Sequence, residues 1–288
     1  MTILFIGRST LDLGYVCPRF PEEDAKLSSE AFTMAGGGPA LNAAVAANAL
    51  GSRTQLASVV GLSPLAQFVK DELDDFGIQL FDLAADAANA LPVSSIIVVP
   101  ANGSRTIVDQ QPEIDLSVSK IADFLLDDVE LVLTDGQFAP VAIALLRLAR
   151  QRAIPTVLDG GSWKPGTRDL LPLTDYAIVS ERFRVPDQND NDPIDCLHRL
   201  GPGNVAVTRG AGPIEWSNAC RRGVVKPPLV EAVDTLGAGD IFHGAFCHYL
   251  ARGADFAKAL ELAAAIAASS CTEFGTRAWI GTIEPQYG

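Results

Sequence analysis

Short apolar segments alternate with longer segments rich in alanine and leucine, and this alternation restricts the fold more than any other feature of the chain. The short segments are bounded by Gly, Asp or Pro and are too short for helices, as buried strands are. They cover residues 3–7, 55–60, 131–134, 156–158, 176–179 and 204–207, and the predicted helices cover 40–50, 64–76, 139–152, 238–250 and 256–269. The alternation predicts an α/β fold: a mostly parallel central sheet with helices on both faces, and ligands beyond the carboxyl ends of the strands.

Two pairs of extended segments interrupt this order. Residues 13–16 and 27–32 follow the first predicted strand, and residues 94–99 and 106–110 form a predicted hairpin around Asn102-Gly103, a strong turn pair. We expect these segments, inserted at about 12–35 and 93–112, to form a small β-sheet lid at the strand ends, where a substrate is covered. Because the sequence contains no repeat or linker, residues 1–288 are predicted to form a single domain.

Charge excludes several classes of partner. Thirty-five acidic and 22 basic residues give a net charge of -13, so no broad positive surface is available for DNA, RNA or an anionic membrane. The first apolar segment lacks the basic head and the stretch of about 7–15 apolar residues that a secretion signal needs. No apolar segment reaches the roughly 20 residues of a membrane span. The five scattered cysteines form no Cys-x-x-Cys pair, which favours reduced thiols and a cytoplasmic location.

A glycine-rich turn precedes the last two predicted helices. Gly237 and Gly239 permit backbone dihedrals in which successive N–H groups, those of Ala238 and Asp240 included, converge at the positive end of a helix. A carboxylate in an anion-binding turn is explained if Asp240 takes a proton from a hydroxyl while the amides hold a transferring phosphoryl group. The alternative from the residues alone is a simple helix cap.

The full string Asp-Thr-Leu-Gly-Ala-Gly-Asp, residues 234–240, resembles the C-terminal signature of the ribokinase-like (PfkB) carbohydrate kinases without a mismatch. The resemblance covers nearly the whole chain and implies a ribokinase-like fold. It also implies that Asp240 is the catalytic base, and that Gly237, Ala238, Gly239 and Asp240 form the anion hole for the γ-phosphoryl group of ATP.

A second glycine cluster opens the first predicted helix. Small residues at 36–38 permit close backbone approach, and Asn42 offers a donor and an acceptor to a polyol. Tight packing alone would also explain such a turn. The segment is similar to the family's N-terminal Gly-Gly-x-x-x-Asn signature at Gly37, Gly38 and Asn42, residues that in the family contact sugar hydroxyls. The same resemblance implies a sugar-binding role for Asp12, which follows the first strand.

Arg105 lies on the proposed lid hairpin, in the string Gly-Ser-Arg-Thr-Ile. Its fork of donors is suited to hydroxyls or to an anionic group, although a solvent-facing residue is the alternative. Together with Asp12 and the segment 20–24, this string is most similar to the ketohexokinase and sulfofructose kinase-like branch of the family. The resemblance therefore implies a ketose substrate. Pro39, where ketohexokinases carry Asn, departs from that pattern.

The nucleotide side is expected after the strand at 204–207. A polar turn there resembles the family turn that lies along ATP, which assigns Thr208, Gly210 and Gly212, with Thr235, to nucleotide binding. Many members carry Asn-x-x-Glu after the strand at 176–179 to place magnesium. This chain has Ser180-Glu181-Arg182-Phe183 instead, which leaves Glu181 as the metal candidate. ATP and Mg²⁺ are the implied cofactors, and a monovalent cation such as K⁺ remains open.

These features predict an ATP-dependent kinase that phosphorylates a primary hydroxyl of a sugar. Two alternatives remain: a nucleoside kinase of the same family, and a non-catalytic sugar sensor on the kinase scaffold. A homodimer through the lid strands is expected, because exposed strand edges attract partners.

Overall fold

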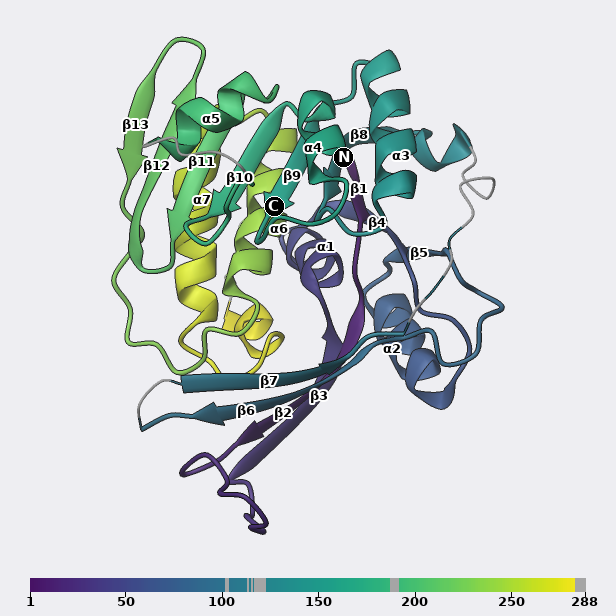
Figure 1. Cartoon of the computed structure of the whole chain (residues 1–288), viewed down its shortest axis with the longest axis vertical. Coiled ribbons are helices and arrows are strands. Elements are labelled where there is room, and N and C mark those ends of the chain that lie inside the picture. The colour runs from purple at the N-terminus through teal and green to yellow at the C-terminus, as the bar shows by residue number, and fades with distance from the viewer. Residues whose placement is uncertain (102–103, 113, 115, 117–122, 187–191, 283–288) are drawn as a thin grey trace.

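The computed structural model describes residues 1–101, 104–112, 114, 116, 123–186 and 192–282, and a nine-stranded sheet forms its centre (Figure 1). The strand order is β13-β12-β11-β10-β9-β8-β1-β4-β5. In this sheet, the strands from β11 through β8 and β1 to β5 all run parallel to one another. Strand β12 runs antiparallel to β11, and β13 runs antiparallel to β12. The strands are β1 Thr2–Ile6, β4 Arg53–Ser58, β5 Gln79–Asp82, β8 Val129–Thr134, β9 Thr156–Gly160, β10 Tyr176–Ser180, β11 Asn204–Arg209, β12 Gly212–Asn218 and β13 Arg222–Val225.

Helices pack on both faces of this sheet, as the sequence predicts. Along β1, Ile3 and Phe5 join the core beneath one group of helices, whereas Leu4 and Ile6 join the core on the opposite face. This alternation follows from the two-residue period of a strand. The helices are α1 Pro39–Ala49, α2 Pro64–Asp75, α3 Ala139–Gln151, α4 Thr167–Leu170, α5 Pro193–Arg199, α6 Ala238–Ala251 and α7 Phe256–Ser270, with short 3₁₀ turns at Asp123–Leu126, Leu171–Leu173 and Ala278–Thr282.

The longest helix of the described part of the chain, α7, has 15 residues. Within those described ranges, no helix combines the length and the apolar character that crossing a membrane requires.

Strand β1 marks the point where the order of the sheet reverses. The chain passes from β1 to β4 and β5 on one side, and later to β8 and the remaining strands on the other. Loops that leave neighbouring strands in opposite directions at such a point open a crevice at the carboxyl ends. The loop after β1 therefore begins where a ligand is expected.

A separate four-stranded sheet projects from the carboxyl ends of the main strands, at the bottom of Figure 1. Its order is β3-β2-β6-β7, built from β2 Thr10–Val16, β3 Ala31–Gly37, β6 Val93–Val99 and β7 Ser104–Gln110. The small sheet is thus formed by the expected segments. The turn predicted at Asn102-Gly103 lies outside the described residues.

One lid strand differs from its prediction. The strand expected at 27–32 lies at Ala31–Gly37, because it pairs with the whole of β2 from Val16 opposite Ala31 to Thr10 opposite Gly37. Gly36 and Gly37 consequently belong to this strand and not to a turn, and the chain turns only at Gly38, whose φ is 89°.

The sequence pattern did not predict β5, β12, β13, α4 or α5. Strands β5 and β13 have four residues each and stand at the edges of the sheet, with no fully buried residue. Without a buried face they lack the apolar pattern from which strands are recognised.

Helices α1 and α6, which carry the two predicted site motifs, pack closely against each other. A Cβ added to Gly244 of α6 would lie 2.2 Å from the carbonyl oxygen of Ala43 and 2.8 Å from the Cβ of Ala46. Small residues at these positions let the two helix backbones approach closely.

We expect Gly244→Ala to lower the free energy of unfolding by about 1–3 kcal/mol, because the added methyl forces α1 and α6 apart. Gly239→Ala is the matched control, since a Cβ at Gly239 meets nothing within 4 Å and alanine is the better helix former by roughly 0.5–1 kcal/mol. Urea unfolding of the three proteins measures both changes. Equal stability of Gly244→Ala and the parent protein would show that the interface between α1 and α6 accommodates the added methyl group.

Candidate active site

A cavity of about 200 Å³ lies between the loop after β1, the start of α1, the start of α6 and the lid. It brings together four of the predicted site residues, namely Asp12, Gly38, Asn42 and Asp240. The other lining residues are Arg8, Thr10, Pro39, Ser94, Ile96, Ile107, Asp109 and Leu236. The two glycine motifs, about 200 positions apart in the sequence, therefore meet at one polar cavity.

Asp240 stands in the first turn of α6. Gly237 caps the helix with φ 70°, a left-handed conformation that glycine adopts at little cost. The Nδ2 of Asn42 donates to Oδ2 of Asp240 at 2.8 Å, which fixes the carboxylate beside the cavity. The first N–H groups of a helix have no acceptor within it. The amides of Gly239 and Asp240 thus accompany the carboxylate at the positive helix end.

The environment of Asp240 makes it a base suited to neutral pH. Burial of the carboxyl raises its pKa to about 7, and the negative charge of Asp159 acts in the same direction. The hydrogen bond from Asn42 and the nearby ring of His243 oppose this rise, while Asp12 adds to it slightly. A carboxylate with a raised pKa accepts a proton from a hydroxyl more readily than an ordinary aspartate does.

His243 lies one turn further along α6. Its Nδ1 lies 2.7 Å from the carbonyl oxygen of Gly239 and 3.4 Å from Oδ2 of Asp159. Its Nε2 lies 3.3 Å from the carbonyl oxygen of Ile178 in β10. These contacts tie the start of α6 to the carboxyl ends of β9 and β10.

Asp12 is buried on the lid strand β2 and faces the same cavity. Thr10 donates to its Oδ1 at 2.6 Å. Burial raises the pKa of Asp12, and hydrogen bonds from Thr10 and Ser94 oppose the rise. Gly37 does not line the cavity, but a Cβ there would lie 2.0 Å from Asp12 Oδ2. Glycine at 37 therefore leaves the space that the Asp12 carboxylate occupies.

Arg277 is a site residue that sequence reasoning missed. Its Nη1 donates to Oδ1 of Asn42 at 2.9 Å, so Asn42 is held on one side by Arg277 and holds Asp240 on the other. Arg277 also donates to Glu72 Oε1 at 2.7 Å and to the carbonyl oxygen of Gly36 at 2.5 Å. Glu72 completes the ring by accepting from the N–H of Gly36. The network joins the root of the lid to the Asn42–Asp240 pair.

Arg105 lies on the lid hairpin, as the sequence predicts. It is exposed on β7 and does not line the cavity. The cavity wall on that strand is formed by Ile107 and Asp109, which lie on the same face of β7 as Arg105 because side chains alternate with a period of two. Its predicted sugar contact stays a prediction. Arg8 and Asp109, two charged liners, were not anticipated.

The predicted nucleotide residues lie at the end of β11, outside this cavity. Thr208, Gly210 and Gly212 occupy the tight hairpin between β11 and β12, where Arg209 pairs with Gly212. Gly210 has φ 57°, and a Cβ there would meet nothing within 4 Å. Thr235 is exposed in the turn before α6, where its carbonyl oxygen accepts from the N–H of Ala238 at 3.4 Å.

Glu181, the metal candidate, is exposed at the end of β10, and its N–H donates to the carbonyl oxygen of Thr208 at 2.9 Å. Among the residues that the structure describes, no group of three or more His, Cys, Asp or Glu side chains could hold a metal ion. Glu181 offers one exposed carboxylate, and Mg²⁺ is commonly held by substrate phosphates together with one or two carboxylates.

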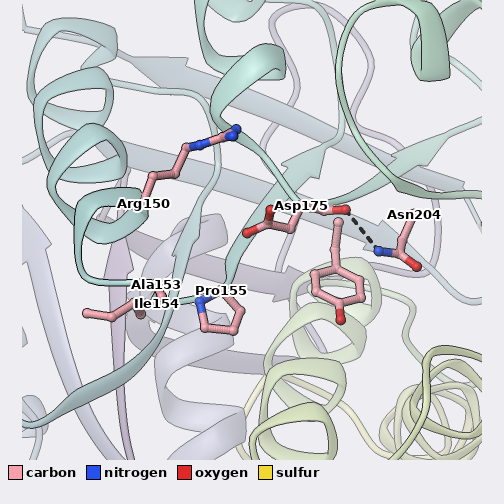
Figure 2. Close-up of a pocket in the computed structure, with 7 residues that line it drawn as sticks. Arg150, Ala153, Ile154, Pro155, Asp175 and Asn204 are labelled. Atoms are coloured by element: carbon pink, nitrogen blue, oxygen red, sulfur yellow. Dashed lines mark hydrogen bonds between the residues drawn. The ribbon is translucent and has the colours of Figure 1, made fainter.

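A second cavity, of about 440 Å³, lies at the opposite ends of the strands (Figure 2). Three of its polar residues, Arg150, Asp175 and Asn204, have partners close to the starts of β9, β10 and β11. Asp175 accepts from the N–H of Thr156 at 2.9 Å and, through its carbonyl oxygen, from Asn204 at 3.2 Å. Arg150 donates to the carbonyl oxygen of Pro172 at 2.5 Å. These bonds account for the residues there by structure alone.

Comparison with known proteins agrees with this geometry. The model of the pfkB family of carbohydrate kinases matches residues 2–282. The chain is 27% identical to a deoxyribokinase of Salmonella typhi, over 99% of this chain and 97% of the relative. It is 24% identical to a ketohexokinase of Mus musculus, over 93% of this chain and 95% of that protein. These matches do not single out the ketohexokinase branch suggested by the sequence.

The fold agrees with that of solved kinases. A ribokinase of Arabidopsis thaliana, solved in complex with ribose and ATP, superposes with a TM-score of 0.74 over 95% of this chain and 93% of that one, at 20% identity. The predicted ribokinase-like fold is thus confirmed. Because the family model spans nearly the whole chain and its two glycine motifs meet at one cavity, this protein belongs to the pfkB family of carbohydrate kinases, phosphotransferases that act on a hydroxyl group.

Proposed function

We propose that this chain transfers the γ-phosphoryl group of ATP to a primary hydroxyl of a small sugar. The observation that carries the proposal is the placement of the Asp240 carboxylate in the cavity that Asp12 and Asn42 also line. Polar groups around a cavity of this kind suit the hydroxyls of a monosaccharide. Deoxyribokinase and ribokinase relatives favour a pentose over the ketose that the sequence resemblance implies.

The residues have separate tasks. Asp12 and Asn42 orient the sugar by hydrogen bonds to its hydroxyls, and Asp240 takes the proton of the reacting hydroxyl. The amides of Gly237, Ala238, Gly239 and Asp240 stabilise negative charge on the transferring group. Thr208, Gly210, Gly212 and Thr235 contact the nucleotide, and Glu181 helps to place Mg²⁺. When bound, Mg²⁺ neutralises charge on the phosphates.

K⁺ dependence and a cytoplasmic location stay predictions from the sequence.

A homodimer through the lid is part of the proposal. The lid face that points away from the cavity carries apolar side chains, including Phe32 and Met34, which are 55% and 40% exposed, and Val108 at 68%. Tyr15 stacks beside Phe32, with ring centroids 5.2 Å apart. An apolar face of this kind next to two exposed strand edges suits a second copy of the same sheet.

Asp240→Asn is expected to lower kcat by about 10²–10⁴-fold while sugar and ATP still bind, because the amide keeps the shape of the side chain but cannot take a proton. ADP release should be assayed against ribose, 2-deoxyribose, fructose and adenosine, with mass detection of the product. ADP release with adenosine and with none of the three sugars would favour a nucleoside kinase. Sugar-dependent thermal stabilisation without ADP would favour the sensor, and unchanged kcat in the variant would refute Asp240 as the base.

The pKa of Asp240 predicts how activity and stability depend on pH. Because the pKa is raised to about 7, kcat/KM should fall about tenfold for each pH unit below 7, as the base becomes protonated. The raised pKa favours the folded state at low pH, and this contribution is lost as pH rises through 7. Asp240→Asn should therefore be more stable than the parent protein at pH 8, with the difference shrinking towards pH 5. A flat kcat/KM profile from pH 5 to 8 would contradict this assignment.

The dimer can be tested by sedimentation velocity. Phe32→Asp places a charge in the proposed interface and should convert the dimer to a monomer. Val224→Asp, at an exposed apolar residue of β13, is the control and should leave the dimer intact. A parent protein that sediments as a monomer at micromolar concentration would exclude the lid interface.

A further inference from the structure

Arg8 occupies a place in the cavity that the proposed mechanism does not use. It follows β1 by two residues, at the point where the order of the sheet reverses. Its backbone N–H donates to Oδ2 of the buried Asp135, at the end of the neighbouring strand β8, at 2.7 Å. A Cβ at Gly7 would lie 2.2 Å from the Asp135 carboxyl group. The backbone at this position is thus fixed, and the Arg8 side chain forms part of the cavity wall.

The Arg8 side chain reaches across to the lid. Its Nη2 lies 2.5 Å from both carboxylate oxygens of Asp109 on β7. Gln111 donates to the same carboxylate at 2.8 Å, and Ser94 lies within 3.4 Å of it. Burial raises the pKa of Asp109, but the hydrogen bonds and charge of Arg8 outweigh it and lower the pKa below the ordinary value. Asp109 is therefore a carboxylate at neutral pH, and the pair is ionic.

This ion pair lies at the cavity wall and is partly exposed to solvent. The side chain of Arg8 is 17% exposed and that of Asp109 is 25% exposed. At this exposure the two charges are partly shielded from water, and neutralisation by a partner counts for more than it does at a free surface. The Nε of Arg8 is buried without a hydrogen-bond partner in the described structure, so the guanidinium keeps a donor that Asp109 does not use.

The charges around the cavity follow a simple pattern. Of the lining residues, Arg8 is the one cation among those the structure describes, and Asp12, Asp109 and Asp240 are the acids. The negative charge of Asp109 neutralises the positive charge of Arg8. The other two acidic residues, Asp12 and Asp240, therefore face the substrate without a lining cation to balance them. A carboxylate or phosphate on the sugar would be repelled there, whereas neutral hydroxyls can donate to these groups.

We propose that the Arg8–Asp109 pair sets the charge class of the acceptor, so that the cavity takes an uncharged monosaccharide. Asp109 neutralises Arg8 from the lid side. Without the Asp109 charge, the Arg8 fork would be available to a carboxylate or phosphate on the sugar, which it matches in geometry. This inference rests on the proposed sugar kinase activity and specifies its substrate.

The test compares kcat/KM for ribose, ribonate and ribose 1-phosphate, which differ in charge at one end of the molecule. The parent protein should prefer ribose. Asp109→Asn, which keeps the size of the side chain but removes its charge, should lower the ratio of neutral to anionic kcat/KM at least tenfold. The double variant Arg8→Gln, Asp109→Asn lacks the released cation and should recover the preference for ribose. Glu30→Gln removes a carboxylate from an exposed lid loop outside the cavity and should leave the ratio unchanged.

Binding provides a second measurement that does not need turnover. Calorimetric titration of Asp240→Asn, with and without Asp109→Asn, should show tighter ribonate binding only when the Asp109 charge is absent. An unchanged ratio in Asp109→Asn, or a parent protein that prefers ribonate or ribose 1-phosphate to ribose, would overturn the inference. Absence of ADP release with every sugar would instead refute the proposed function, and ribonate binding by calorimetry would still report on the Arg8–Asp109 pair.

Discussion

The hydrogen bond between Asn42 and Asp240 is the contact on which the site depends. It joins the first turns of α1 and α6, two helices brought together because Gly244 lets their backbones approach. Each helix begins at a glycine with positive φ, Gly38 for α1 and Gly237 for α6. The proposed sugar side and the proposed phosphate side of the cavity are thereby joined by one interhelical contact. A shift of either helix would move the proposed base relative to the sugar.

The lid is tied to this contact from two directions. Arg277 holds the Asn42 side chain and the carbonyl oxygen of Gly36 at the root of β3. At the far edge of the lid, Asp109 of β7 bonds Arg8 of the main domain. Both connections use a guanidinium, which can bridge several acceptors in one plane. The lid position is therefore coupled to the orientation of Asn42 and to the charge balance of the cavity.

Much of the fold could be predicted because the central strands are buried on both faces and leave clear apolar runs, as residues 131–134 do. The short edge strands β5 and β13 have no such face, and the start of β3 depends on its register with β2. In the site, Asp240, Asn42 and Gly38 could be proposed from the two glycine motifs, and Asp12 only from the family resemblance. Arg8, Asp109 and Arg277 are single charged residues without a motif, and tertiary packing alone brings them together. The position of Arg8 directly after the first strand was the one available signal.

The central claim is that Asp240 is a shielded carboxylate, placed to take a proton from a sugar hydroxyl. Its titration can be followed by ¹³C NMR of carboxyl-labelled aspartate, with the spectrum of Asp240→Asn to assign the resonance. The account predicts a midpoint of about 7 and a change in the resonance when the sugar binds. A midpoint near 4, the ordinary range for aspartate, with no response to sugar would contradict it.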